Sequence, residues 1–404
     1  MKTLIELYDE RTIEDVIAPE VFQPEKVVYL CPEEIAQNKA KQKILKDFLL
    51  RRGLRVETEF LESSLYKSDR ILKQLRKVAE ENEDFALDVS GGTDAALVAA
   101  GMFCNETQAP TFTYSRRRNR FYDISNAPFA DGLPCDLRYS VEDFFAMAGG
   151  RLREGRVDNG VLERYLDRID AFFGVFLKYR RSWNKQITFF QRISQVPKDT
   201  VIPLKVSGAR EQKGERGSRV QMKTELLRDL ESIGFLRRVR FEGDRVSFAF
   251  ADLQVRAWLR DVGSALELYM YKACLDAGIF HDVISSAIVD WGDDSEYRKA
   301  AGDRANHDLV YNEIDVVAAR GVIPLFISCK ACEVKTEALN ELAILADRFG
   351  GKGAKMAIAT TEPCNSAARH RAAQLGIAVI DLEELKAGKA SERLKVILKQ
   401  RESL

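Results

Sequence analysis

The first 150 residues alternate between short apolar runs and longer stretches with helical periodicity. The runs that are rich in β-branched residues, or that alternate polar and apolar positions, predict strands at 27–31, 54–61, 85–90 and 109–115. Helical periodicity covers 33–52, 66–81 and 93–105. Strands that are separated by helices imply a parallel sheet with crossover connections. The pattern therefore predicts an α/β chain that opens with a Rossmann-like domain over residues 1–150.

The middle of the chain, residues 151–258, follows a different pattern. Residues 151–194 have helical periodicity, whereas 196–218 are rich in Gly, Lys and Arg and are expected to be a linker or loop. A helix is then predicted to end at Gly234, followed by a hairpin that turns at Gly243-Asp244. A helix followed by a β-hairpin resembles a winged helix. Modules of this kind bind DNA, but many only connect domains or dimerise.

Residues 259–404 show a third pattern, which predicts a further α/β domain. The expected order is helix, three strands, helix, strand, helix, strand. The predicted helices are 264–277, 336–348 and 365–375, and the predicted strands are 281–291, 312–321, 322–330, 355–360 and 376–381.

Composition narrows the class of protein. The chain has 404 residues and no net charge, so bulk charge gives no support to nucleic-acid binding, although a local basic groove would suffice. Seven scattered cysteines argue against a disulfide framework. Because no apolar run reaches the ~18–20 residues of a membrane span and acids occur early in the N-terminus, we expect a cytoplasmic protein without membrane contact.

The two strands of the C-terminal hairpin carry an unusual charge pair. Side chains alternate along a strand, so pairing the two strands can bring Asp315 next to Ser328 and Lys330. A carboxylate and an ammonium at the end of otherwise apolar strands are costly to bury unless they are paired or bound to a metal. A structural ion pair is one explanation, and a catalytic site is the other.

These residues, in this order of elements, resemble the PD-(D/E)XK nucleases. The resemblance implies that Asp315 and a second acid hold Mg²⁺ or Mn²⁺, while Lys330 orients or deprotonates the attacking water. Where this family has its second acid, the present chain has Ser328. Either Asp315, a backbone carbonyl and waters hold the metal, or another acid compensates, the candidates being Glu267, Glu313, Glu333 and Glu337.

Glu267 matches the helix acid that precedes the strands in this family, but Ser264-x-x-Glu267 is also a capping-box pattern. The predicted catalytic residues are Asp315, Lys330, Ser328 and Glu267, and the predicted metal ligands are Asp315, Glu267 and Cys329.

A second candidate site lies in the N-terminal domain, where Ser90-Gly91-Gly92-Thr93-Asp94 joins a strand to its helix. Glycines allow a close backbone approach, and a helix N-terminus offers free N–H groups to an anion. The loop at Cys31 and Pro32 is expected at the same carboxyl edge of the sheet, where ligands of open parallel sheets bind. A tight turn without a ligand is the alternative. The predicted ligand-binding residues are Ser90, Gly91, Gly92, Thr93, Asp94, Cys31 and Pro32.

The SGGTD segment resembles two families. It is similar to the PP-loop of ATP pyrophosphatases, but it has Ala95 where that motif has serine and follows the third predicted strand rather than the first. It also resembles the CARF domain, the Rossmann-like sensor of cyclic oligoadenylates in type III CRISPR systems. A CARF-like front, a winged-helix-like middle and a PD-(D/E)XK-like back together resemble the CRISPR ancillary nucleases that cyclic oligoadenylates activate.

The CARF resemblance implies a homodimer that binds a ring of adenylates, with cyclic tetra-adenylate (cA4) as the leading choice. Ring binding would then activate cleavage of single-stranded DNA or RNA, nicking of duplex DNA, or both. Arg116, Arg117 and Arg118 could contact phosphates, but we expect them to be a solvated basic run. Two alternatives stay open: a PP-loop ATP-dependent enzyme, and a non-catalytic winged-helix regulator.

Overall fold

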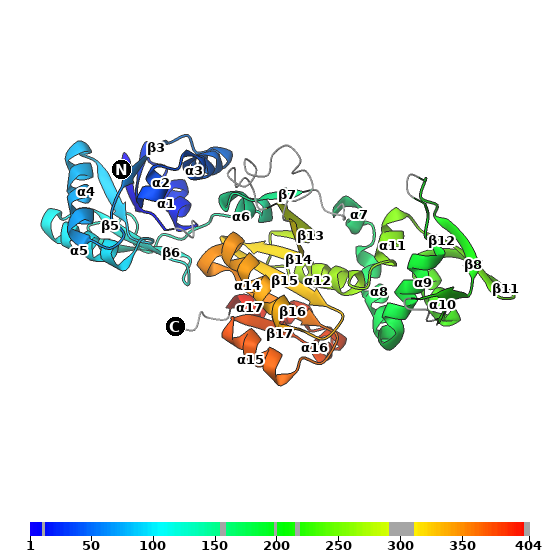
Figure 1. Cartoon of the computed structure of the whole chain (residues 1–404). Helices are drawn as coiled ribbons and strands as arrows, with labels where there is room; N and C mark the ends of the chain where they lie inside the picture. The colour runs from blue at the N-terminus through cyan, green and yellow to red at the C-terminus, as the bar shows by residue number, and fades with distance from the viewer. Residues whose placement is uncertain (10–12, 154–158, 198–199, 215–218, 291–310, 400–404) are drawn as a thin grey trace.

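The computed structural model describes residues 1–9, 13–153, 159–197, 200–214, 219–290 and 311–399, and it places two six-stranded sheets and a smaller module along one elongated chain (Figure 1). The N-terminal sheet has the order β3-β2-β1-β4-β5-β6, in which only β6 runs antiparallel to its neighbour. Its strands are β1 (Thr3–Leu7), β2 (Lys26–Cys31), β3 (Glu57–Glu62), β4 (Phe85–Asp88), β5 (Thr111–Ser115) and β6 (Arg120–Ser125).

Strand β1 was not expected from the sequence, and it lies at the centre of this sheet between β2 and β4. All five of its residues are buried, because a central parallel strand is covered on both faces. The strand predicted as the first, 27–31, is therefore the second. The SGGTD segment follows the fourth strand along the chain and not the third.

Helices cover both faces of the N-terminal sheet. They are α1 (Glu14–Phe22), α2 (Glu33–Ala36), α3 (Lys39–Arg51), α4 (Ser68–Glu81) and α5 (Asp94–Thr107). Helix α6 (Val141–Met147) follows the sheet and packs between α3 and the C-terminal sheet. Apolar residues of α4 and α5 pack on one face. Those of α1, α3 and α6 belong to a core that continues into the C-terminal domain. The N-terminal domain is thus joined to the C-terminal domain by shared apolar packing.

The middle module forms one end of the molecule. Its helices are α7 (Asn159–Glu163), α8 (Leu166–Tyr179), α9 (Trp183–Ile193), α10 (Thr224–Ser232) and α11 (Leu253–Trp258), with a short 3-10 turn at Arg180–Ser182. The expected hairpin is present as β11 (Leu236–Glu242) and β12 (Arg245–Phe250), turning at Gly243. The predicted loop at 196–218 is wrong in part, because it contains β8 (Lys205–Ala209) and β9 (Glu211–Lys213). Strand β8 pairs with β12 and completes a three-stranded sheet.

The C-terminal sheet has the order β17-β16-β15-β14-β13-β7. Its elements are α12 (Ser264–Ala277), β13 (Asp282–Asp290), β14 (Tyr311–Arg320), β15 (Ile323–Lys330), α14 (Thr336–Gly350), a 3-10 turn (Gly351–Gly353), β16 (Lys355–Thr360), α15 (Ser366–Gln374), β17 (Ile377–Ile380), α16 (Leu382–Lys386) and α17 (Ala390–Lys399). This is the element order expected from the sequence, with α16 and α17 added after it.

The edge strand of the C-terminal sheet comes from an unexpected part of the chain. Strand β7 (Arg151–Arg153) pairs antiparallel with β13, although 151–194 was expected to be helical. A three-residue strand has too few positions to show alternation, so only its long-range pairing reveals it. The C-terminal sheet therefore includes a strand from the segment that was predicted to begin the middle module. None of the described helices is long and apolar enough to cross a membrane.

Candidate functional site

Asp315 and Lys330 lie side by side on the adjacent strands β14 and β15. The register pairs Val316 with Ile327, which brings Asp315 opposite Ser328. Asp315 Oδ2 accepts a hydrogen bond from the Cys329 backbone N–H at 2.6 Å and one from Ser328 Oγ at 3.3 Å. The Lys330 ammonium lies 3.9 Å from the same oxygen. The predicted cluster of Asp315, Ser328 and Lys330 is thus present in the fold.

Glu267 joins this cluster from α12, the helix that precedes the strands. Its carboxylate folds back over the start of the helix, where a Cβ on Gly263 would collide with Glu267 Oε1. The N-cap of α12 is Gly263 and makes no side-chain capping hydrogen bond, so the capping-box alternative for Ser264 and Glu267 is wrong. Glu267 also lines a hollow with Glu313 and the β13 residues Ser285 and Ser286.

The electrostatics of the cluster are those of crowded, poorly solvated carboxyl groups. Burial, followed by repulsion from Asp315, Asp261 and Glu313, raises the pKa of Glu267 to about 9, against a smaller opposing effect of Lys330. Burial also raises the pKa of Asp315, although Lys330 and the Cys329 N–H oppose the shift. A bound cation would relieve both costs, because it stabilises the ionised forms that burial disfavours.

The fit of a metal to this cluster rests on two side-chain carboxylates. Among the described residues, no three His, Cys, Asp or Glu side chains are grouped as a metal-binding set. Mg²⁺ commonly binds through one or two carboxylates and keeps several waters, so Asp315 and Glu267 suffice for this class of ion. The Cys329 thiol is buried in the apolar core and its pKa is raised by burial, so its backbone carbonyl is the atom available as a ligand.

The other acids proposed as substitutes for Ser328 divide into two groups. Glu313 is exposed on β14, shares the hollow with Glu267 and contributes to its raised pKa. Glu333 instead accepts a hydrogen bond from Asn365 at 3.1 Å and lines a separate surface hollow. Glu337 lies in the first turn of α14. Of the four candidates, Glu267 and Glu313 are therefore the ones that the fold brings together.

The second predicted site forms at the carboxyl edge of the N-terminal sheet. Cys31, Pro32, Gly92 and Thr93 line one small hollow together with Ser63, Ser64 and Leu65. Thr93 is the N-cap of α5: its hydroxyl accepts from Ala96 N–H at 3.3 Å and donates to the Leu65 carbonyl at 2.8 Å. The loops after β2, β3 and β4 thus converge, as expected for a ligand site on an open parallel sheet.

The two glycines of this segment are required by close packing against the end of β1. A Cβ on Gly91 would lie 2.7 Å from the Leu7 carbonyl oxygen and 3.2 Å from the Asp9 Cβ. Gly92 has φ +90°, and a Cβ there would lie 2.8 Å from that of Leu7. The loop is therefore in direct contact with the segment that follows β1.

Three of the predicted ligand-binding residues, Ser90, Gly91 and Asp94, do not line the hollow. Gly91 packs on the segment after β1, as described above. The Ser90 hydroxyl pairs with Asp88 Oδ1 and accepts the Tyr114 backbone N–H at 2.7 Å, so it holds β4 to β5. Asp94 is exposed on the first turn of α5. Proximity in sequence placed them in the site, but the local turn directs Ser90 into the sheet and Asp94 outward.

Three buried acids below this edge were missed by the sequence analysis. Glu6 on β1 is the register partner of Asp88 on β4, and Asp15 of α1 lies close enough to both to repel them. Burial raises the pKa of all three carboxyl groups, to about 7 for Asp88. Within the described part of the chain, Glu6 Oε1, Asp15 Oδ2 and Asp88 Oδ2 have no hydrogen-bond partner. Glu6, an acid inside the apolar segment TLIEL, was the sequence feature that could have pointed to this group of buried acids.

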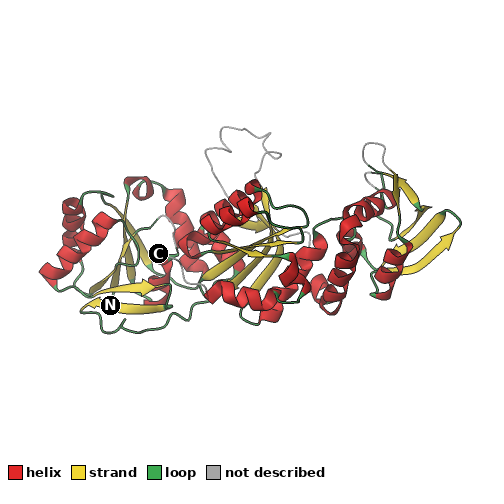
Figure 2. Cartoon of the chain, turned by 90° about the horizontal axis from the view of Figure 1, so that it is seen from below, coloured by secondary structure: helices red, strands yellow, loops and turns green. Residues whose placement is uncertain are grey.

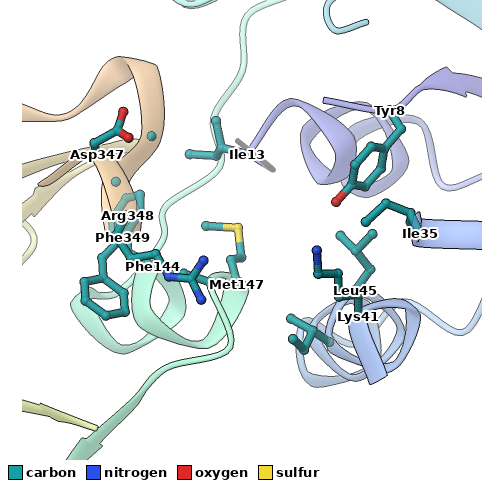
Figure 3. A pocket seen from close by; sticks show the side chains of 14 residues that line it. Tyr8, Ile13, Ile35, Lys41, Leu45, Phe144, Met147, Asp347, Arg348 and Phe349 are labelled. Carbon is teal, nitrogen blue, oxygen red and sulfur yellow. The ribbon is translucent and has the colours of Figure 1, made fainter. Parts of the chain in front are cut away.

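The N-terminal domain meets the C-terminal domain next to these loops. Lys352, in the turn after α14, forms an ion pair with Asp9, Nζ to Oδ2 2.6 Å. Arg116 pairs with Glu14 and packs on Gly353, so it is largely buried, whereas Arg117 and Arg118 are exposed as expected. Tyr8, Lys41 and Arg348 line a cavity between the two domains (Figure 3). The expectation of a wholly solvated arginine run is therefore wrong at Arg116.

Comparison with known proteins gives a fold but no sequence family. No family model matches the chain, and no curated protein matches it. The structure of protein VC1899 from Vibrio cholerae matches with a TM-score of 0.73 and 17% identity, over 98% of this chain and 99% of that one. Can2 from Sulfobacillus thermosulfidooxidans, in complex with cA4, matches with a TM-score of 0.68 and 16% identity, over 99% and 98%. The chain therefore has the fold of these proteins over nearly its whole length, as the resemblance to CARF-domain CRISPR ancillary proteins implied.

Proposed function

We propose that the chain is a metal-dependent nuclease that a cyclic oligoadenylate activates, with cA4 as the first ligand to test. The observation that carries the catalytic half is the cluster of Glu267, Asp315 and Lys330, in which two carboxyl groups with raised pKa lie beside an ammonium. A structural ion pair needs one carboxylate and does not explain the second. Support for the sensor half comes from the shared fold with Can2, whose structure holds cA4.

Each residue of the cluster has a distinct proposed task. Asp315 and Glu267, with the carbonyl of Cys329, would hold Mg²⁺ or Mn²⁺, which when bound supplies an acidified water and charge stabilisation. The Cys329 N–H fixes Asp315 through its 2.6 Å hydrogen bond, and Ser328 supports the same oxygen. Lys330 places a positive charge beside Asp315, where it can stabilise negative charge that develops on a scissile phosphate and orient the attacking water.

In the sensor domain, we propose that the hollow at Cys31, Pro32, Gly92 and Thr93 binds part of the adenylate ring. The backbone N–H groups at the start of α5 suit a phosphate, because a helix N-terminus attracts anions. A ring with two-fold symmetry would be shared by two such domains in a homodimer. Binding must then favour the active arrangement over the resting one, since a ligand with equal affinity for both shifts nothing.

The test is a cleavage assay on labelled single-stranded DNA, single-stranded RNA and supercoiled plasmid. Wild type is compared with Lys330→Ala and with Lys389→Ala, which removes an exposed lysine of the same domain. Each is assayed with Mg²⁺ or Mn²⁺, with and without cA4. We expect cA4-dependent cutting by wild type and by Lys389→Ala, and loss of cutting in Lys330→Ala. Cutting that survives Lys330→Ala would refute the site, and ATP hydrolysis without cutting would favour the PP-loop alternative.

A further inference from the structure

The outer face of the small sheet in the middle module carries a concentration of positive charge. Along β8, β12 and β11, alternate residues are buried against the module's helices, and the residues between them are exposed or half-buried. The strand register arranges the outward residues in three rows: Arg237, Ala249 and Lys205; Arg240, Ser247 and Ser207; Glu242, Arg245 and Ala209. Four of these nine positions are cationic and one is acidic.

A β-bulge produces this arrangement. Arg237 and Arg240 are three residues apart, so a regular strand would point them to opposite faces. The register shifts between them, and Arg238 within the bulge has φ +56°. As a result, Arg237 pairs with Ala249 and Arg240 with Ser247, two positions that share one face of β12. A bulge that re-aims side chains in this way is typical of a functional surface, and here it brings both guanidinium groups to the same side.

The charges on this face are not neutralised by the protein. Within the described residues, no ion pair joins Lys205, Arg237, Arg240 or Arg245 to an acid, and Arg245 makes only a long hydrogen bond of 3.5 Å to Ser207. Neutral small side chains occupy the centre of the face, so nothing bulky separates the cations from a partner. An ordinary solvated surface mixes both signs of charge evenly, whereas this face has four cations and one acid, Glu242.

The chemistry of this face favours a polyanion that is bound through its phosphates and not through its bases. Phe241, the aromatic residue of β11, is covered by the guanidinium groups of Arg210 and Arg228 and is not presented for base stacking. Sequence-independent binding to a nucleic acid relies on Lys and Arg against phosphates. The small central residues allow a sugar–phosphate backbone to approach the sheet closely. Figure 2 shows this sheet at one end of the molecule, with helices of the middle module on one side of it.

We propose that the outer face of β8, β12 and β11 binds the sugar–phosphate backbone of a nucleic acid. That this nucleic acid is the strand to be cut rests on the proposed nuclease function; the binding itself does not. The face lies on a different domain from Asp315 and Lys330, so it would hold a part of the substrate away from the cleaved bond. Binding of this kind adds affinity for long strands and none for short ones.

The experiment measures binding of full-length protein to labelled single-stranded DNA, single-stranded RNA and duplex DNA by fluorescence anisotropy. Lys330→Ala is the parent, so that no cutting interferes, and no metal or cA4 is added. The test variant carries Lys205→Gln, Arg237→Gln and Arg240→Gln. The control variant carries Lys39→Gln, Lys43→Gln and Lys46→Gln, which remove the same charge from exposed positions of α3. A second test variant, Ser207→Glu, adds an acid to the face without removing a cation, and thermal melting checks that each variant is folded.

We expect the test variant to bind nucleic acids of every sequence more weakly than the parent does. Its slope of log affinity against log salt should be shallower by about two to three, because each lost phosphate contact removes about 0.7–0.9 from that slope. Ser207→Glu should also weaken binding, and the α3 control should match the parent. Unchanged affinity and slope in both test variants would overturn the proposal, as would binding of phosphatidylserine vesicles but not of nucleic acid. If the test variant binds more weakly but the wild type cuts nothing in the cleavage assay, the nuclease function is refuted and this proposal stands.

Discussion

Lys352 of the C-terminal domain forms an ion pair with Asp9 of the N-terminal domain, with 2.6 Å between Nζ and Oδ2. Asp9 lies in the segment on which Gly91 of the proposed ligand loop packs. A displacement of that loop therefore reaches the C-terminal domain through two direct contacts. Lys352 is half exposed, so the pair contributes at most about 1 kcal/mol.

We predict that Asp9→Ala and Lys352→Ala each reduce the ratio of cA4-stimulated to basal cleavage, by up to about fivefold for 1 kcal/mol of coupling. Stimulated and basal initial rates on single-stranded DNA give this ratio. The charge-exchanged pair, Asp9→Lys with Lys352→Asp, should recover part of it, because the attraction is restored with opposite polarity. Equal ratios in wild type and both single variants would show that the ion pair does not couple the domains.

The second prediction concerns Gly263, which leaves room for the Glu267 carboxylate. A methyl group at this position would collide with Glu267 Oε1 and displace it from Asp315 and Lys330. We expect Gly263→Ala to lower cleavage by about 10–100-fold, the effect of misplacing a ligand of a metal site, with the apparent affinity for Mg²⁺ falling in parallel. Gly101→Ala is the matched control, since a Cβ at that helical glycine meets nothing within 4 Å. A Gly263→Ala enzyme with wild-type rate and metal dependence would remove Glu267 from the site.

The elements that the sequence predicts well are those whose pattern is local. The boundaries of α12, Ser264–Ala277, and of β16, Lys355–Thr360, coincide with expectation, because helical periodicity and an apolar run bounded by turns identify them. Strand β1 was missed, since burial on both faces removes the alternation and Glu6 interrupts its apolar run. Pairing across β14 and β15 was predictable because a short hairpin fixes the register.

Other features depend on contacts that no local pattern encodes. Strand β7 exists through its pairing with β13, more than a hundred residues later. The Ser90 hydroxyl turns into the sheet because it donates a hydrogen bond to Asp88 there and accepts one from the Tyr114 N–H. The choice of Glu267 over Glu333 as the partner of Asp315 likewise needed the packing of α12 against the sheet, which the residue types alone did not determine.

The third prediction follows from the pKa of Glu267, which is about 9 in the folded chain and about 4.3 for an unperturbed glutamate. Between these values the folded state binds more protons than the unfolded state, so the stability of the metal-free protein falls as pH rises through this window. We expect the melting temperature of Glu267→Gln, relative to wild type, to increase steadily from pH 5 to pH 9. Glu392→Gln serves as the control, because Glu392 is an exposed acid of the same domain outside this cluster. Parallel melting curves for wild type and Glu267→Gln across that range would contradict the buried, protonated state.

The fourth prediction is that a divalent cation displaces the proton of Glu267 when it binds. Mg²⁺ or Mn²⁺ binds the ionised carboxylates, so it must displace the proton of Glu267 and should bind more tightly as pH rises. In calorimetric titrations at pH 7, we expect wild type to release protons on binding Mn²⁺, seen as a heat that varies with the ionisation enthalpy of the buffer. Asp315→Asn should lose Mn²⁺ binding, because it removes a charged ligand, whereas Lys389→Ala should bind like wild type. Mn²⁺ binding that persists in Asp315→Asn, or that releases no proton from wild type, would locate the cation elsewhere and leave the carboxyl cluster as a structural feature of the sheet.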